Sequence, residues 1–400
     1  MVRSAWAFGG WKIYQPRPAM TDGTTQSLVK ILYPFAGETV GGSHLSTLTL
    51  IEALPKDRFL PIILLHKKSE LARYLEQRGL DYFLAEDAPM VSTGSLINQT
   101  WQMRKVAAQL GGILKRNHID IVHTNDGRMH ATWAIACRLA GCPQLWHQRS
   151  ADNSRRLSLY AKMAAAVVTI SDHCRQQLTP RLARHVMTIY DPFDVETPVP
   201  DRQTARRNLC RELGVDEKTP LVGYVANLTA LKRPLTFVDM AAGIAERFTQ
   251  TVAFPMIGAA RGGMQLKIAE RIEETGGAGK CFLLGARFPI EPYMAAFDLL
   301  VAPAVNEGLG RTLIEAALAG TPIVAADHGG HREIIEDGVS GSLVEPDNPA
   351  AFAEAACELL EDRTKAEALS EQAKRTVVDR FATAKHVSAI TQIYERIKAA

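Results

Sequence analysis

Two glutamates separated by seven residues mark the segment of this chain with the clearest chemistry. Within PAVNEGLGRTLIE, residues 303–315, Glu307 precedes the turn Gly308-Leu309-Gly310, and Glu315 lies in the helix expected after it. Glycines at the start of a helix leave its N–H groups accessible, and the partial positive charge there attracts anions and hydroxyl oxygens. Such carboxylates can accept hydrogen bonds from sugar hydroxyls and from a vicinal diol such as a ribose. The spacing alone also suits an ordinary capped helix with one surface glutamate.

The residues after Glu315 extend this pattern. A tight turn at Gly320-Thr321-Pro322 precedes a short apolar run, and a Gly329-Gly330 loop then leads to Glu333. The combination resembles the family 4 retaining glycosyltransferases of the GT-B fold. In that family a pair of glutamates with seven residues between them is followed by a small-residue turn and a Gly-Gly-x-x-Glu loop.

The resemblance is highly specific over 220–360 and weaker over 29–195, and it does not reach 1–28. It implies an α/β protein of the GT-B class, with two Rossmann-like domains facing each other across a deep cleft. We expect an N-terminal extension, an acceptor domain, a nucleotide-sugar donor domain and a last helix that crosses back to the acceptor domain. The boundaries expected for these four parts are 1–28, 29–195, 196–379 and about 380–400.

The resemblance also implies roles in binding a nucleotide-diphosphate sugar. Glu307 and the turn Gly308-Leu309-Gly310, through its amides, would face the donor sugar, with Glu307 taking part in catalysis. Glu315 would hold the ribose hydroxyls.

A second family element lies in GYVANLTALK, residues 223–232. The family usually places an arginine and, about five residues later, a lysine on the donor diphosphate. Lys232 matches the lysine, whereas Asn227 stands where the arginine is usual and supplies no charge. Arg233, Arg287 and Arg311 are candidates for the missing charge, although an arginine on a surface helix or loop is usually only solvated.

Gly41 and Gly42 resemble the family's glycine loop after the first strand, where small residues let the backbone approach the leaving diphosphate. A Gly-Gly turn before a helix is also common as plain structure. The chain contains neither the Gly-x-Gly-x-x-Gly dinucleotide fingerprint nor a P-loop.

His147 ends a predicted strand in LWHQRS, and ligands of open α/β sheets gather at the carboxyl ends of strands. The resemblance implies that His147 reaches the donor sugar as a catalytic residue; the alternative is a structural imidazole. His123 and Asp126 follow a strand at the same edge and are candidates for the acceptor site. Arg149 would meet an anionic acceptor or a membrane surface, or is simply solvated.

Short apolar runs alternate with helical patterns, which predicts parallel, doubly wound sheets. The alternation loosens between Asp191 and Asp201, where we expect a linker. The expected strands are 30–35, 59–65, 120–123, 144–147, 167–170, 221–225, 252–257, 280–284, 299–302, 322–325 and 342–344. The expected helices are 46–54, 70–78, 101–117, 132–140, 234–248, 264–275, 312–319, 349–360 and one long helical pattern over the last ~30 residues.

The composition is that of a soluble globular protein: 46% of the 400 residues are apolar, 22% are charged and the net charge is +3. That charge gives no reason to expect nucleic acid as a partner. It is uneven, with +8 in residues 1–195 and −5 in the remainder. The six cysteines form no Cys-x-x-Cys and are expected to be reduced core residues in the cytosol. No Asp-x-Asp clamp occurs, so we expect neither a metal nor another cofactor.

The resemblance implies a retaining glycosyltransferase that acts from a nucleotide-diphosphate sugar, and the lack of an Asp-x-Asp clamp predicts that it needs no metal. The expected acceptor is a glycan or a lipid-linked intermediate of envelope polysaccharide synthesis. The basic first half favours the cytoplasm or the inner face of the cell membrane, in contact with anionic lipid. Two alternatives share the donor cleft: a GT-B nucleotide-sugar epimerase or hydrolase, and a non-catalytic nucleotide-sugar binding protein. The base, sugar and acceptor are not readable from the sequence.

Overall fold

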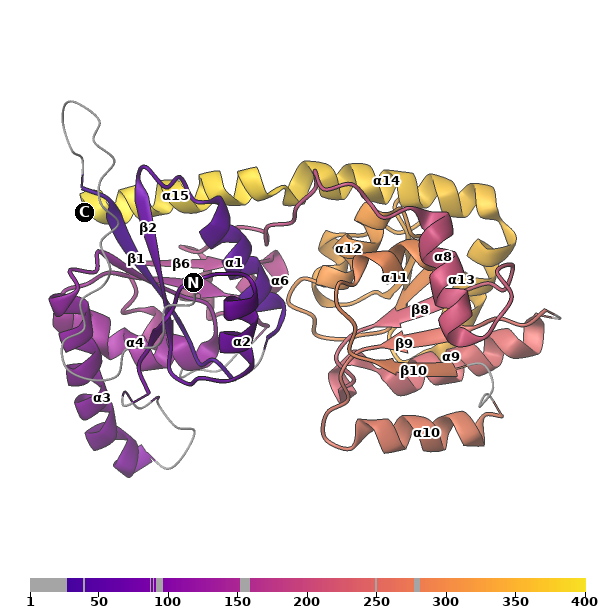
Figure 1. The fold of residues 1–400 in the computed structure, drawn as a ribbon, viewed down its shortest axis with the longest axis horizontal. Helices are drawn as coiled ribbons and strands as arrows, with labels where there is room; N and C mark the ends of the chain where they lie inside the picture. The colour runs from indigo at the N-terminus through magenta and orange to yellow at the C-terminus, as the bar shows by residue number, and fades with distance from the viewer. Residues whose placement is uncertain are drawn as a thin grey trace.

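In the computed structural model the described residues form two α/β domains side by side, each built on a parallel sheet (Figure 1). The structure describes residues 27–38, 40–86, 88, 90, 96–151, 159–248, 250–276 and 281–400. All but the last two residues of the expected extension 1–28 lie outside the described residues.

Among the described residues, the N-terminal sheet has seven strands in the order β3-β2-β1-β4-β5-β6-β7, all pairing parallel. Most of these strands are mainly apolar, because helices cover both faces of a parallel sheet. Their bounds are β1 Val29–Phe35, β2 Phe59–Leu65, β3 Phe83–Leu84, β4 Ile121–Thr124, β5 Gln144–Gln148, β6 Ala166–Thr169 and β7 Met187–Thr188.

Local signals fix the helices of this domain. The Asp126 side chain accepts from the Met129 N–H at the start of α4, and Gly141 ends α4 in the left-handed conformation. Ser171 caps α6 in the same way, through the Cys174 N–H. The helices are α1 Gly42–Ala53, α2 Glu70–Gln77, α3 Leu96–Arg116, α4 Gly127–Ala140, α6 Asp172–Gln176 and α7 Pro180–Ala183.

The C-terminal sheet has six parallel strands, within the part of the chain that the structure describes, in the order β10-β9-β8-β11-β12-β13. Its strands are β8 Val222–Val225, β9 Phe254–Ile257, β10 Cys281–Gly285, β11 Leu299–Ala302, β12 Ile323–Ala326 and β13 Ser342–Val344. Its helical elements are α8 Arg202–Leu213, η1 Ala230–Lys232, α9 Pro234–Arg247, α10 Met264–Glu274, α11 Glu291–Ala296, α12 Arg311–Ala319, η2 Gly329–Glu333 and α13 Pro349–Glu361.

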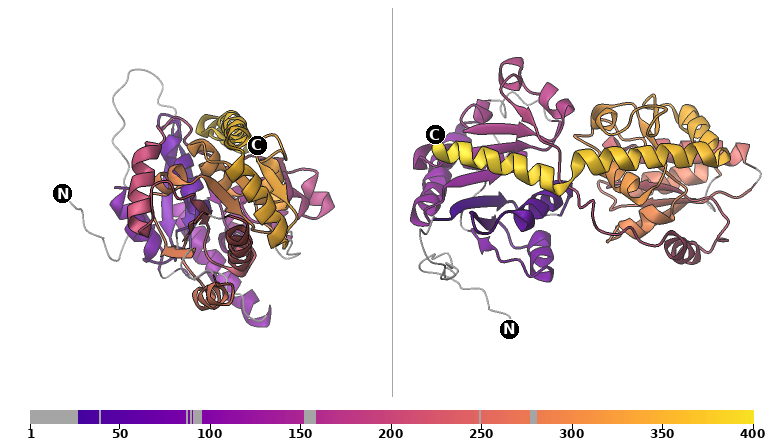
Figure 2. Two further views of the ribbon diagram at one scale, coloured as in Figure 1. Left: turned by 90° about the vertical axis from the view of Figure 1, so that its right-hand side faces the viewer. Right: turned by 90° about the horizontal axis from the view of Figure 1, so that it is seen from above.

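The last two helices run along one side of both domains, as Figure 2 shows from above. Helix α14 (Arg363–Phe381) packs on the C-terminal domain, and α15 (Thr383–Ala399) packs on the N-terminal domain, where Ile390, Ile393 and Tyr394 are buried in its core. At the break between α14 and α15, the Phe193 N–H donates to Phe381 O and the Thr383 N–H donates to Phe193 O. The chain therefore crosses between the domains twice, and the two crossings are hydrogen-bonded to each other.

Most expected elements appear within a few residues of their expected bounds, and the differences have local causes. The long helical pattern at the end of the chain divides into α14 and α15, because Ala382 adopts an extended conformation. Helix α4 begins five residues before Thr132, since Asp126 caps it earlier. The sequence interpretation missed the short strand β3 and the helices α7, α8 and α11.

Candidate active site between the domains

A cavity of about 330 Å³ lies between the two domains. The N-terminal domain contributes the first residues of α1 and the ends of β5 and β6. The C-terminal domain contributes the end of β8, residue Lys232 of η1 and the segment from β11 into α12. These are the carboxyl ends of the parallel strands, where open α/β sheets bind ligands.

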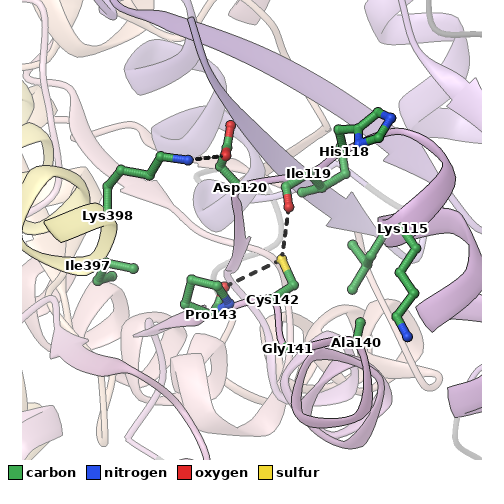
Figure 3. A pocket seen from close by; sticks show the side chains of 11 residues that line it. Lys115, His118, Ile119, Asp120, Ala140, Gly141, Cys142, Pro143, Ile397 and Lys398 are labelled. Carbon is green, nitrogen blue, oxygen red and sulfur yellow. Dashed lines mark hydrogen bonds and ion pairs between the residues drawn. The ribbon is translucent and has the colours of Figure 1, made fainter. Parts of the chain in front are cut away.

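A second cavity, of about 430 Å³, lies at the opposite edge of the N-terminal sheet (Figure 3). Lys115, His118, Asp120, Cys142 and Lys398 contribute to its lining, and Lys398 pairs with Asp120. None of the predicted site residues lines it. Although it is larger, the chemistry predicted from the sequence converges on the interdomain cavity.

The turn between β11 and α12 needs glycine for steric reasons. Gly310 has a φ of +100°, and a Cβ added there would lie 2.8 Å from the His331 ring. A Cβ on Gly330, in η2, would lie 2.5 Å from Leu309 Cα, so the two loops pack backbone against backbone. No side chain among the described residues caps α12. Its first turn therefore presents amide groups and the positive end of the helix dipole to the cavity.

Glu307 and Lys232 form an ion pair inside this cavity. Burial lowers the pKa of Lys232 to about 8. The pair places a carboxylate and an ammonium group beside the start of α12, where they could contact the hydroxyls and the phosphate of a phosphorylated sugar.

Glu315 and Arg311 lie one turn apart on α12 and both line the cavity. The Arg311 Nη2 is 3.4 Å from Glu315 Oε1, and burial raises the pKa of Glu315 although Arg311 opposes this. Arg311 also donates from Nη1 to Ser46 Oγ on α1, at 2.6 Å, and so links the two domains.

Of the remaining predicted donor residues, Asn227 and Gly42 line the cavity. Gly41 is the N-cap residue of α1 and lies next to the cavity lining. Gly42 is required by close packing, since a Cβ there would lie 2.6 Å from Arg311 Cδ. The structure thus brings the predicted donor residues of both domains to one place.

His147 and His123 lie in a buried network beneath the cavity rather than in its lining. The His123 Nε2 is 3.2 Å from His147 Nδ1, and His123 Nδ1 is 2.5 Å from the Tyr394 hydroxyl of α15. The Tyr394 hydroxyl is in turn 2.7 Å from that of Tyr33. Burial and the positive charge of Arg149 lower the pKa of both histidines well below the ordinary value, so both rings are neutral.

Arg149 connects this network to the cavity. Its guanidinium pairs with Asp191, donates to Asn125 Oδ1 at 2.9 Å and approaches His147 Nδ1 at 3.3 Å. Because the His147 Nδ1 must accept from Arg149, the proton of this neutral ring sits on Nε2. That nitrogen is buried and has no hydrogen-bond partner among the described residues.

Comparison with known proteins agrees with this geometry. Residues 205–376, most of the C-terminal domain, match the family described as Glycosyl transferases group 1. Over these residues the C-terminal domain resembles the group 1 glycosyl transferases. D-inositol 3-phosphate glycosyltransferase of Corynebacterium urealyticum is 32% identical over 187 residues, 45% of this chain and 44% of that protein.

A more distant relative is the lipopolysaccharide core biosynthesis mannosyltransferase LpsB of Rhizobium meliloti. It is 28% identical over 192 residues, 47% of this chain and 54% of LpsB. The chain therefore matches about half the length of these curated relatives.

Anabaena HepE, solved in complex with UDP and glucose, has a TM-score of 0.78 at 23% identity, covering 92% of this chain and 99% of HepE. The C-terminal domain and the N-terminal domain together thus have the fold of HepE. The expected GT-B class is confirmed.

Three expectations about the N-terminal domain need correction. Arg149 is not a solvated surface residue: its side chain is 3% exposed, because Asp191 compensates its charge. His123 cannot touch an acceptor in this structure, since it is fully buried and both its ring nitrogens have partners. His147 has no surface towards the cavity, because Arg149 lies between them. One carboxylate oxygen of Asp126 accepts the hydrogen bond from the Met129 N–H that caps α4.

Three arginines were candidates to replace the charge that Asn227 lacks, and only some of them lie near the cavity. Arg233 pairs with Asp347 and Arg287 pairs with Glu212, both outside the cavity lining. Arg311 is the candidate that lines the cavity.

Sequence reasoning did not predict the contacts between the C-terminal domain and the N-terminal domain. The Ser171 hydroxyl, at the start of α6, donates to Gly308 O in the site turn. The Glu333 carboxylate accepts from the Asp172 and His173 N–H groups at 2.9 and 2.8 Å. Glu333 stood out in the sequence as part of a motif, but the motif gave no sign of its partner in the other domain.

Among the described residues no group of three or more His, Cys, Asp or Glu side chains is placed to hold a metal ion. None of the described helices is long and apolar enough to cross a membrane.

Proposed function

We propose that this protein is a retaining glycosyltransferase that moves a sugar from a nucleotide-diphosphate sugar to an acceptor hydroxyl without a metal ion. The observation that carries the proposal is the convergence of Glu307, Lys232, Glu315 and the uncapped start of α12 on one interdomain cavity. The names of the relatives, and the UDP and glucose bound to HepE, support the same assignment.

In the proposed reaction the bond between the anomeric carbon and the phosphate oxygen breaks, and the acceptor oxygen bonds to the same face of that carbon. The acceptor proton passes to an oxygen of the departing diphosphate. Lys232 and the amides of Leu309 and Gly310 stabilise the charge that develops on the diphosphate. Removal of one such preorganised donor typically costs about 2.7–4 kcal/mol of transition-state stabilisation.

Glu307 is proposed to stabilise an oxocarbenium-like sugar and to accept hydrogen bonds from its hydroxyls. Its ion pair with Lys232 supports this role over that of a nucleophile, because an adjacent ammonium lowers the nucleophilicity of a carboxylate. His147 is proposed as a positioning residue that acts through Arg149, given that it reaches the cavity only by way of that side chain.

The acceptor is proposed to be a glycan or a lipid-linked intermediate of cell-envelope polysaccharide synthesis, used at the cytoplasmic face of the membrane. The name of LpsB and the +8 charge of residues 1–195 support this. Co-sedimentation with liposomes should then depend on anionic lipid, and binding that is equal on neutral liposomes would count against the membrane part of the proposal.

The test is a panel of UDP-, GDP-, ADP- and TDP-sugars, measured for thermal stabilisation and turnover in EDTA. We expect one donor to raise the melting temperature and to be hydrolysed slowly, with faster release of nucleotide once an acceptor is present. NMR of the product should show the anomeric configuration of the donor. Release of an altered free sugar without transfer would favour an epimerase or hydrolase, and binding without turnover a non-catalytic protein.

A further inference from the structure

The positively charged side chains that line the interdomain cavity differ in how firmly they are held. Arg149 is almost fully buried, and its charge is matched by Asp191 and its Nε by Asn125. Lys232 is paired with Glu307. Each of these two cations therefore already has a carboxylate partner in direct contact.

Arg311 is held less tightly. Its Nη2 lies 3.4 Å from Glu315 Oε1, well beyond the 2.7–2.9 Å that is usual for a charge-assisted hydrogen bond. Its Nη1 donates to a neutral hydroxyl, Ser46 Oγ, and its guanidinium stacks 4.2 Å from the centre of the Phe193 ring. A guanidinium has five N–H donors, so stacking and two contacts leave further donors for a ligand.

The position of Arg311 is also suited to an anion. It is the first residue of α12, and its side chain lies against Gly42, the first residue of α1. The N-termini of two helices, of 9 and 12 residues, thus face the same guanidinium, and each favours negative charge. Asn227, which also lines the cavity, contributes no charge.

We infer, resting on the proposed function, that Arg311 binds the donor diphosphate and exchanges its contact with Glu315 for one with phosphate when the donor ribose arrives. The ribose hydroxyls occupy the Glu315 carboxylate, which frees the guanidinium without leaving either charge unpaired. Because Ser46 holds Arg311 to α1, the diphosphate is then bound by both domains at once. Donor binding and the contact between the domains are coupled through this one side chain.

The experiment compares UDP with uridine on the full chain, or the diphosphate and nucleoside of whichever base the donor panel selects. We expect Arg311→Ala to weaken UDP about 10- to 100-fold, the range for one hydrogen-bonded charge. The affinity for uridine, measured by saturation-transfer NMR, should change less than about twofold because uridine has no phosphate. Arg311→Lys, which keeps the charge but loses the planar fork, should fall between these values.

Arg287→Ala is the matched control, since Arg287 is paired with Glu212 on the surface and lies outside the cavity lining. It should leave the UDP affinity unchanged. If wild-type protein binds none of the four nucleoside diphosphates, the proposed function itself fails. Suppose that the wild-type protein binds UDP, but that Arg311→Ala either weakens the binding of UDP and of uridine equally or leaves both affinities unchanged. The inference about Arg311 is then wrong, and the proposed function stands. Should Arg311→Ala fail to fold, the UDP and uridine affinities of Arg311→Lys decide the question.

Discussion

The segment 304–315 of the C-terminal domain and the cluster of His123, His147 and Arg149 in the N-terminal domain occupy equivalent places in two similar folds. The segment follows the carboxyl end of β11, and the cluster lies at the carboxyl ends of β4 and β5, on the side of the same cleft. In segment 304–315, carboxylates and backbone amides line the cavity. In the N-terminal cluster, the imidazoles are buried behind the ion pair of Arg149 and Asp191. The carboxyl end of a strand therefore marks a candidate site, but burial decides which side chains reach the ligand.

The two regions also differ in what holds them together. The C-terminal turn is shaped by close backbone packing at Gly310 and Gly330. The N-terminal cluster is held by hydrogen bonds and an ion pair whose members are almost fully buried. Substitutions in the turn's polar side chains should cost activity, whereas substitutions in the cluster should cost stability first.

The largest expected effect is that of Arg149→Met on stability. Removing the guanidinium leaves Asp191 buried without its partner, which typically costs about 3–5 kcal/mol, or roughly 10 °C in melting temperature for a domain of this size. Scanning calorimetry should show this loss, and the double variant Arg149→Met/Asp191→Asn should recover much of it. A loss of less than about 2 °C in the melting temperature of Arg149→Met would contradict the view that the N-terminal cluster mainly supports stability.

Glu307→Gln should have the next largest effect, on turnover rather than on stability. We expect kcat to fall about 100-fold, because the neutral amide stabilises a cationic sugar far less than a carboxylate does. Melting temperature and donor affinity should change little, since Lys232 is partly exposed and remains beside the site. Glu354→Gln, at an exposed position of α13, is the control. Unchanged turnover with intact donor binding would remove Glu307 from the reaction.

Donor affinity should also depend on pH through Lys232. Its pKa of about 8 means that the ammonium is charged below pH 8 and is progressively lost above it. We expect the affinity to be flat from pH 6.5 to 7.5 and to fall by up to about tenfold per unit above pH 8. Lys232→Arg, whose guanidinium stays protonated, should abolish this alkaline decline. A decline that persists in Lys232→Arg would assign it to another group.

The smallest effect is expected for Tyr394→Phe, which tests how far the sealed cluster extends. The variant leaves the His123 Nδ1 and the Tyr33 hydroxyl without a partner, at a cost of about 1–3 kcal/mol. Chemical denaturation measures this loss. Tyr82→Phe, which removes only an exposed hydrogen bond to Glu76, should cost less than about 0.5 kcal/mol. Equal losses in the two variants would show that the network adds no stability of its own.

The sequence predicted most of the fold because its strands are continuous apolar runs of parallel sheets and its helices carry caps that act locally. The short strand β3, of two residues, was not predicted because so few residues carry no periodicity. The convergence of Glu307, the glycine turn and Glu315 was also predictable, because they are close in sequence and local spacing nearly fixes their geometry. The burial of His123 and Arg149 was not predicted, because burial depends on distant residues.

What the sequence determined by itself is the α/β alternation and the local motifs, since capping, glycine turns and hydrophobic runs act over a few residues. Only the tertiary structure decided that Arg149 is neutralised by Asp191, that Glu333 accepts from the amides of α6, and that Arg311 contacts Ser46. These partners are 42, about 160 and 265 residues apart in the chain. Contacts over such separations depend on how strands, helices and domains pack, and no local pattern of residue types specifies that packing.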